Sequence, residues 1–170
     1  VSVPYNTQGM QHPRTGAAYA GILMRIWYQN WREYPTIQLT QPLTADTWYT
    51  FECYVSLADN HCGVEQFGVY FSVGNPYTAI TTPYPVQPQI ETNYGFFSDT
   101  ANWKLIRGCY LAEGGEQYLM FGNFHNDLQT PLDPVCEDLF TSYYFLDDMS
   151  LVEGISQDEP ELILGGPEFA

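Results

Sequence analysis

The stretch YTFECYVSL, at residues 49–57, alternates one set of side chains (Tyr, Phe, Cys, Val, Leu) with another (Thr, Glu, Tyr, Ser). The stretch QFGVYFSV, at residues 66–73, repeats this alternation with Phe, Val, Phe and Val on one face. A period of two is typical of a β-strand that buries one face, because successive side chains point to opposite sides of a sheet. These two stretches therefore predict two strands that pack on a common core.

Runs of aromatic and aliphatic residues predict further strands over 18–26, 36–40, 103–112, 117–124 and 142–152. Clusters of Gly, Pro, Asn and Asp separate these runs, as turns do in all-β proteins. No window shows an apolar stripe of helical period with capping residues. The sequence therefore predicts an all-β protein, folded as an antiparallel β-sandwich.

Three segments interrupt or follow this pattern. Residues 74–95 contain four prolines and three tyrosines, and they are expected to form a long excursion because proline cannot donate the hydrogen bond of a central strand. Residues 125–140 are expected to form a second long loop. The segment 154–170 is acidic, with Gly and Pro, and is expected to be a linker or a donated strand. The predicted domain therefore covers residues 1–153.

The charge of the chain is strongly negative. Its 170 residues include 20 Asp and Glu but only five Lys and Arg, which gives a formal net charge of −15 at pH 7. A phosphate backbone or an anionic bilayer would be repelled, so nucleic acids and membrane surfaces are disfavoured as partners. Cations are the natural counter-ions, and Ca²⁺ is the first candidate among them.

The chain has four cysteines, an even number that allows two disulfides, and their spacing contains no CxxC zinc or redox motif: Cys53, Cys62, Cys109 and Cys136. The single Lys and the aromatic-rich, acidic composition favour an oxidising, extracellular compartment. If the strand over 48–58 pairs with that over 142–152, the loops that hold Cys62 and Cys136 lie at one end of the sandwich. We therefore expect a Cys62–Cys136 disulfide, with buried thiols at the other two positions.

Asp147, in the run YYFLDDMSLVE at residues 143–153, carries the clearest chemical signal. By simple alternation it shares a strand face with Phe145, Met149 and Leu151, and an unpaired carboxylate there would be costly. Asp147 is therefore expected to accept hydrogen bonds or to bind a cation. The sequence contains no GxSxG, HExxH, P-loop or GxGxxG motif, and an enzyme is not predicted.

Several segments, in order along the chain, resemble the jelly-roll domain of surface proteins from the Bacteroidetes group. They are HPRTGAAYAGI, REYPTIQLTQPLTADTWYTFECYVSLADN, FGVYFS, PQI, WKLIRGCYLAEGGEQYLMFGNF and YYFLDDMSLVE, and the resemblance covers roughly residues 8–153. This domain is distantly similar to carbohydrate-binding modules. The resemblance implies a jelly-roll β-sandwich that serves as a non-catalytic module for adhesion or glycan binding at the outer cell surface.

The same resemblance implies details of individual residues. In carbohydrate-binding relatives the first Asp of the last strand often ligates a structural Ca²⁺, which corresponds to Asp147 here. A short Asp–Thr/Ser–apolar motif can be O-glycosylated in that group, and Asp99-Thr100-Ala101 matches it, which makes Thr100 the acceptor. Family members have a strand and a further segment before the equivalent of residues 1–10, so the resemblance leaves open a sandwich without its first strand.

Glycan binding would use aromatic rings that stack on sugar rings. The candidates are Trp27 and Trp31, which follow the first predicted strand, and Tyr77 and Tyr84, which lie in the proline-rich excursion. The alternative for each is an aromatic side chain that packs in the core or a loop. The rival function is a structural subunit of an extracellular filament, assembled when the apolar run of residues 162–164 pairs with a neighbouring copy. A glycoside hydrolase is the least favoured reading.

Overall fold

The structure is a computed structural model. Its regular secondary structure, in the residues that it describes, consists of β-strands. Among these residues no helix is long and apolar enough to span a membrane. The described residues are 2–26, 29–76, 82–93, 95–136 and 141–155, together with the backbone of 163–165. The strands are β1 (Tyr5–Asn6), β2 (Gly9–Met10), β3 (Ala20–Ile26), β4 (Thr36–Gln38), β5 (Trp48–Leu57), β6 (Gly68–Ser72), β7 (Ile90–Glu91), β8 (Lys104–Leu111), β9 (Tyr118–Gly122), β10 (Thr141–Glu153) and β11 (Ile163–Gly165).

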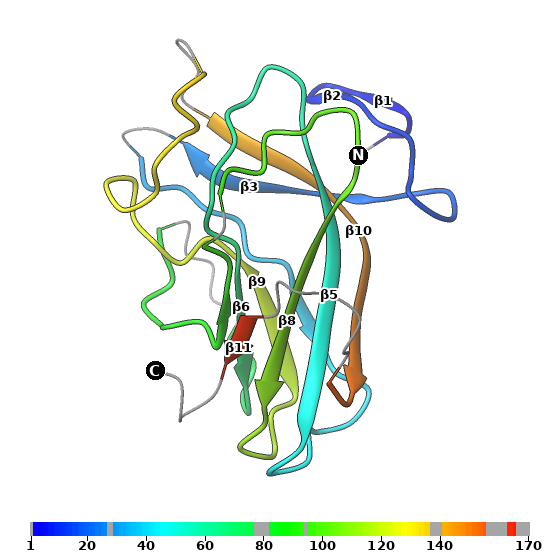
Figure 1. The fold of residues 1–170 in the computed structure, drawn as a ribbon, viewed down its shortest axis with the longest axis vertical. Coiled ribbons are helices and arrows are strands. Elements are labelled where there is room, and N and C mark those ends of the chain that lie inside the picture. Colours follow the sequence, from blue (N-terminus) through cyan, green and yellow to red (C-terminus); the bar gives the residue numbers. More distant parts are fainter. Residues whose placement is uncertain are drawn as a thin grey trace.

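Strands β3 to β10 form two facing sheets (Figure 1). One sheet has the order β11-β8-β5-β10-β3 and the other has the order β4-β9-β6-β7. Without β11, this is the strand order of an eight-stranded jelly roll, so the predicted fold class is confirmed. The resemblance left open a sandwich without its first strand, but in the structure Ala20–Ile26 takes that place and pairs with β10 at the sheet edge.

The space between the two sheets is filled by aromatic and aliphatic side chains. Three phenylalanines are fully buried there, and the ring of Phe121 from β9 packs against those of Phe51 from β5 and Phe67 beside β6. Phe71 and Tyr110 stack almost in parallel across the sandwich, with 4.7 Å between ring centroids. Buried aromatic pairs of this kind contribute stability beyond their burial alone, so the core explains the high aromatic content.

Strand β10 contains a β-bulge that changes which residues face the core. Asp147 lies opposite Tyr54 and Ser150 lies opposite Glu52, so two residues of β10 face a single residue of β5. Asp148, within the bulge, has a positive φ of 47°. The alternation therefore shifts by one position at this point.

The bulge overturns the expected surroundings of Asp147. Met149 and Leu151 pack on the main core, as Tyr144 and Leu146 do before the bulge. Phe145 instead belongs to a small cluster with Tyr19 and Ala58. Asp147 shares the face of Phe145, so the expectation that it points toward the same side as Met149 and Leu151 is wrong.

The predicted disulfide is present in the structure. Cys62 and Cys136 are bonded, with 5.8 Å between their Cα atoms. Cys62 follows β5 and its backbone N–H donates to the carbonyl of Thr141 at the start of β10, as expected from the pairing of these two strands. Cys53 and Cys109 are buried free thiols, which also confirms the expectation.

Candidate functional site

The strongest candidate site is a cleft of about 490 Å³ at one end of the sandwich, which we call the tyrosine cleft. It lies between the end of β6, the proline-rich segment and the turn that joins β8 to β9. Its size falls within the roughly 300–1,000 Å³ typical of small-molecule sites. Its lining residues are Tyr70, Phe71, Ser72, Val73, Gly74, Asn75, Pro76, Tyr84, Gln89, Tyr110, Glu113, Gly114 and Glu116.

Tyr84 is held in the cleft by a neighbouring tyrosine. The hydroxyl of Tyr34 donates to the carbonyl of Asn123 at 2.8 Å and accepts the backbone N–H of Tyr84 at 2.9 Å. Burial raises the pKa of Tyr34 to about 12, so this hydroxyl keeps its proton and its donor role at neutral pH. The Tyr84 ring packs beside Tyr70, with 6.3 Å between centroids and 41° between ring planes.

Gln89 fixes the proline-rich segment against β6. Its side-chain oxygen accepts the N–H of Phe71 at 2.8 Å, and its amide nitrogen donates to the carbonyl of Phe71 at 3.0 Å. The backbone N–H of Gln89 donates to Val69. A side chain thus supplies the ladder bonds beside a segment whose prolines cannot supply them, and it keeps this wall of the cleft in place.

Glu116 fixes the opposite wall, the turn at residues 113–116. Its carboxylate accepts the Tyr110 hydroxyl at 2.6 Å and the backbone N–H groups of Glu113 and Gly114 at 2.9 Å each. Gly114 has a φ of +100°, and a Cβ there would lie only 2.7 Å from that of Ala45. The turn therefore requires glycine at this position, and Glu116 is committed to holding it.

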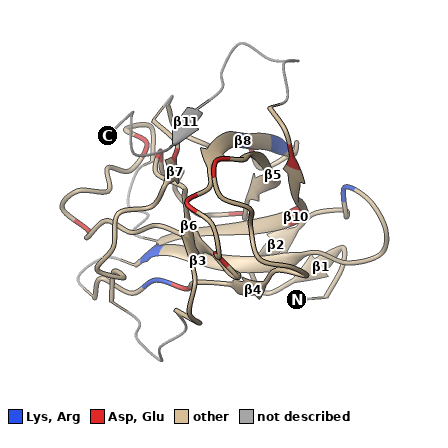
Figure 2. Cartoon of the chain, turned by 90° about the horizontal axis from the view of Figure 1, so that it is seen from below, with Lys and Arg blue, Asp and Glu red and all other residues tan. Residues whose placement is uncertain are grey.

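The charge of the cleft is negative. Glu113 and Glu116 contribute carboxylates, and no basic residue is among the described residues that line it. All five Lys and Arg of the sequence form ion pairs, and they lie scattered over the fold (Figure 2). An anionic ligand would find no partner charge in this cleft, whereas a neutral polar ligand would meet rings, amides and carboxylates.

The four aromatic residues proposed for glycan binding do not all fall within the described residues. Trp27 and Tyr77 lie outside them. Tyr84 lines the tyrosine cleft, and Trp31 is 47% exposed on the segment after β3. Sequence reasoning missed Tyr70, because its position in the alternation of β6 marked only the polar face of a strand.

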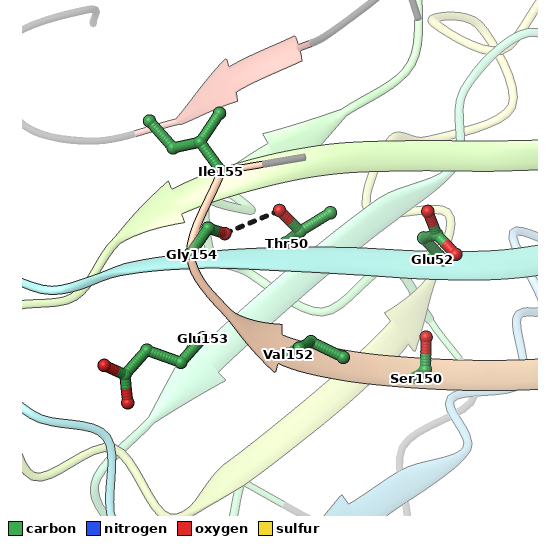
Figure 3. A pocket seen from close by; sticks show the side chains of 7 residues that line it. All are labelled: Thr50, Glu52, Ser150, Val152, Glu153, Gly154 and Ile155. Atoms are coloured by element: carbon green, nitrogen blue, oxygen red, sulfur yellow. Dashed lines mark hydrogen bonds between the residues drawn. The ribbon is translucent and has the colours of Figure 1, made fainter. Parts of the chain in front are cut away.

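A second depression, about 290 Å³ in volume, lies at the start of β5 and the end of β10 (Figure 3). The Thr50 hydroxyl donates to the carbonyl of Gly154 at 2.7 Å, and Glu52 pairs with Arg107. Val152 is 60% exposed and lies on the same face of the sheet as Thr50 and Glu52. The depression presents no aromatic ring among its described lining residues, so it is a weaker candidate than the tyrosine cleft.

Asp147 and Asp148 bind the segment that precedes β3. The carboxylate of Asp147 accepts the backbone N–H groups of Arg14 and Asp148, both at 2.8 Å. The carboxylate of Asp148 takes the Thr15 hydroxyl and the Arg14 guanidinium, which lower its pKa. The guanidinium also lies 3.5 Å from the ring centroid of Tyr54.

This donor arrangement does not fit a calcium site. Ca²⁺ takes six to eight oxygen ligands, whereas the two carboxylates here accept hydrogen bonds and pair with an arginine. Within the described ranges no group of three or more His, Cys, Asp or Glu side chains could hold an ion. Calcium binding by Asp147 stays a prediction, and the contacts of Asp147 favour a purely protein-bonded role.

The melting temperature of the wild-type protein is expected to be the same in EDTA and in calcium, because Arg14 already supplies the positive charge. Asp147→Ala is expected to melt at a lower temperature, because the backbone N–H groups of Arg14 and Asp148 lose their carboxylate acceptor. The melting temperature of this variant is also expected to be unchanged by EDTA. Circular dichroism at 218 nm, or differential scanning calorimetry, measures both. A wild-type melting temperature that falls in EDTA would restore the calcium assignment.

Thr100 is exposed, in a turn organised by Asp99. One oxygen of Asp99 accepts the N–H groups of Ala101 and Asn102, and Lys104 pairs with the other. The O-glycosylation of Thr100 stays a prediction.

Comparisons with known proteins give a structural likeness but no family. No protein-family model and no curated protein matches the sequence. The crystal structure of the K3 cleaved adhesin domain of Lys-gingipain, from Porphyromonas gingivalis W83, is similar over 86% of this chain and 81% of that chain. The TM-score is 0.44 and the identity is 14%. This neighbour comes from the Bacteroidetes group, and at these values the likeness assigns no function to this chain.

Proposed function

We propose that this chain is a non-catalytic, extracellular surface module that binds a neutral carbohydrate in the tyrosine cleft. The observation that carries the proposal is the pairing of two half-buried tyrosine rings, Tyr70 and Tyr84, with the polar wall of residues 113–116. A sugar ring presents an apolar face and polar edges, and this cleft offers a partner for each.

The charge of the cleft narrows the ligand class. Glu113 and Glu116 would repel acidic sugars, and no base among the described lining residues offsets them. Carboxylates accept hydrogen bonds from sugar hydroxyls, and amides both accept and donate them, so the ligand needs no charge of its own. Neutral hexoses and their oligomers are therefore the preferred class.

The role of Glu116 supports binding over catalysis. A glycoside hydrolase needs two carboxyl groups opposed across the glycosidic bond, one of which must exchange a proton. Glu116 is 4% exposed and accepts three hydrogen bonds, two from N–H groups of its own turn and one from the Tyr110 hydroxyl on β8. A carboxylate held in this way stabilises the cleft wall and is poorly placed to transfer protons to a ligand.

The proposed compartment rests on the disulfide. A bonded Cys62–Cys136 pair persists where the surroundings are oxidising, as outside the cell. The strongly acidic composition, with a net charge of −15, is compatible with a solvated surface protein.

A glycan array that contains neutral and acidic oligosaccharides tests the proposal, followed by calorimetric titration with the best neutral hit. Tyr84→Ala is expected to weaken that binding about fivefold, because a stacked ring contributes on the order of 1 kcal/mol. Tyr84→Phe keeps the ring and is expected to retain most of the affinity.

The matched control is Tyr5→Ala, since Tyr5 is 70% exposed on β1 and lies outside the cleft. It should leave the affinity unchanged. The proposal fails if the protein binds no neutral glycan on the array, or if the Tyr84→Ala and Tyr5→Ala variants bind the neutral glycan with equal affinity.

A further inference from the structure

Strand β11 is an addition to a jelly roll that is already complete. Strands β3 to β10 supply all eight strands of that fold. Residues 163–165 extend the five-stranded sheet beyond them, with Ile163 opposite Gly108 and Gly165 opposite Tyr110 (Figure 1). This pairing is parallel, whereas the described strands of both sheets otherwise pair antiparallel.

The part of β8 that β11 covers differs from the part that it leaves open. Of the part that it leaves open, residues 104–107 carry Lys104 and Arg107, and Leu111 follows the covered part. The covered part, residues 108–110, is Gly-Cys-Tyr and carries no charge. Charged side chains on an edge strand hinder pairing with a further strand. The uncharged part of β8 is therefore the stretch of this edge that is open to another strand.

Strand β11 also contacts β7, the edge strand of the opposite sheet. It thus lies where the edges of the two sheets come together, beside both β7 and β8. Ile90 of β7 and Tyr110 of β8 are buried at this side of the sandwich. An extended segment here gains backbone hydrogen bonds from β8 and shields the edge of the core.

The register shows that one chain can make this contact by itself. Ile163 is level with Gly108, which is level with Phe51 and hence with Leu151 of β10. The chain must cross three strand spacings, about 14 Å, between β10 and β11. The nine residues 154–162 can span at most about 30 Å. Pairing within one chain is therefore unstrained, and its effective concentration is high.

We propose that the uncharged edge of β8 is an acceptor site for an extended peptide segment, and that residues 163–165 of the same chain occupy it. The site works by β-augmentation, in which main-chain hydrogen bonds supply the affinity. A second copy can offer the same segment, so the occupied site protects the edge from pairing with other molecules. This proposal is independent of carbohydrate binding.

Deleting residues 156–170 empties the site and tests the proposal. The truncated protein is expected to bind a fluorescently labelled peptide PELILGGP, the sequence of residues 160–167, in an anisotropy titration. The full chain is expected to bind it at least about tenfold more weakly, because its own strand competes at high effective concentration. The control peptide carries Leu164→Pro, which removes a backbone donor and is expected not to bind.

A truncated protein that keeps its circular dichroism spectrum and does not bind the peptide would overturn the proposal. If the truncated protein does not fold, cross-linking in the full chain decides instead. The register places position 164 opposite Cys109, so Leu164→Cys is expected to give a Cys109-dependent disulfide at monomer mass on a non-reducing gel.

The other two possible results of the cross-linking would each overturn a part of the proposal. Cys109-dependent ladders of higher mass would overturn occupancy by the same chain and assign the edge to a second copy, as the filament alternative requires. No Cys109-dependent product under oxidising conditions would overturn the acceptor site. Cys109→Ala in the Leu164→Cys background is the control for other cysteine pairings.

Discussion

Asp127→Ala is expected to lower the free energy of unfolding by about 3–5 kcal/mol, since it removes the carboxylate beside two buried arginines. The side chains of Arg25 and Arg32 are at most 2% exposed. Asp127 lies 2.9 Å from Arg32 and 3.9 Å from Arg25. Burial lowers the pKa of both guanidinium groups, and the nearby carboxylate opposes this effect.

Urea unfolding followed by fluorescence measures this loss. Glu153→Ala is the matched control, because Glu153 is an exposed carboxylate at the end of β10, and its removal should change the stability by less than about 0.5 kcal/mol. Asp127→Asn keeps the size of the side chain and removes its charge, so it is expected to lose most of the same stability. An Asp127→Ala protein as stable as the control would show that solvent, and not Asp127, balances the two arginines.

Loss of the Cys62–Cys136 disulfide is expected to cost about 4 kcal/mol. The bond closes a loop with a sequence separation of 74 residues, and constraining a loop of this length in the unfolded chain accounts for that magnitude. Cys136→Ser should therefore unfold at a markedly lower urea concentration than the wild-type protein. Reductant should lower the wild-type midpoint to the same value and leave the variant unchanged.

Peptide mapping without reductant checks the pairing independently. It should link Cys62 to Cys136 and leave Cys53 and Cys109 as thiols. Burial raises the pKa of Cys53, so this thiol should react with alkylating reagents only after unfolding. A linkage between Cys53 and Cys62 would contradict both the structure and the expected effect of reductant.

The strands were predictable from the sequence because alternation is a local property. The prediction over 49–57 matches β5 at Trp48–Leu57, and the prediction over 142–152 matches β10 at Thr141–Glu153. The bulge at Asp148 was not predictable, because nothing in FLDDMSL marks an extra residue, and one extra residue reverses every later face. Strand β7 was missed because only two residues pair within a proline-rich segment.

The candidate site was predictable only in part. Tyr84 was singled out because aromatic residues in a proline-rich loop are free of the strand pattern. Tyr70 was missed because its role depends on which loop crosses the outer side of β6. The cluster of Asp127 with Arg25 and Arg32 was missed for a similar reason, since Asp127 and Arg25 are 102 residues apart and arginines usually lie at the surface.

The ion pairing of all five basic residues has a consequence for how copies of the protein meet. Each basic residue is already paired with a carboxylate within the fold. The remaining carboxylates therefore dominate the long-range electrostatic interaction between two copies, which is repulsive. Two copies therefore approach against mutual repulsion, which reaches far in dilute buffer and fades beyond about 8 Å at physiological ionic strength. Encounters between copies should accordingly become faster as salt is added, the reverse of what is usual for oppositely charged partners.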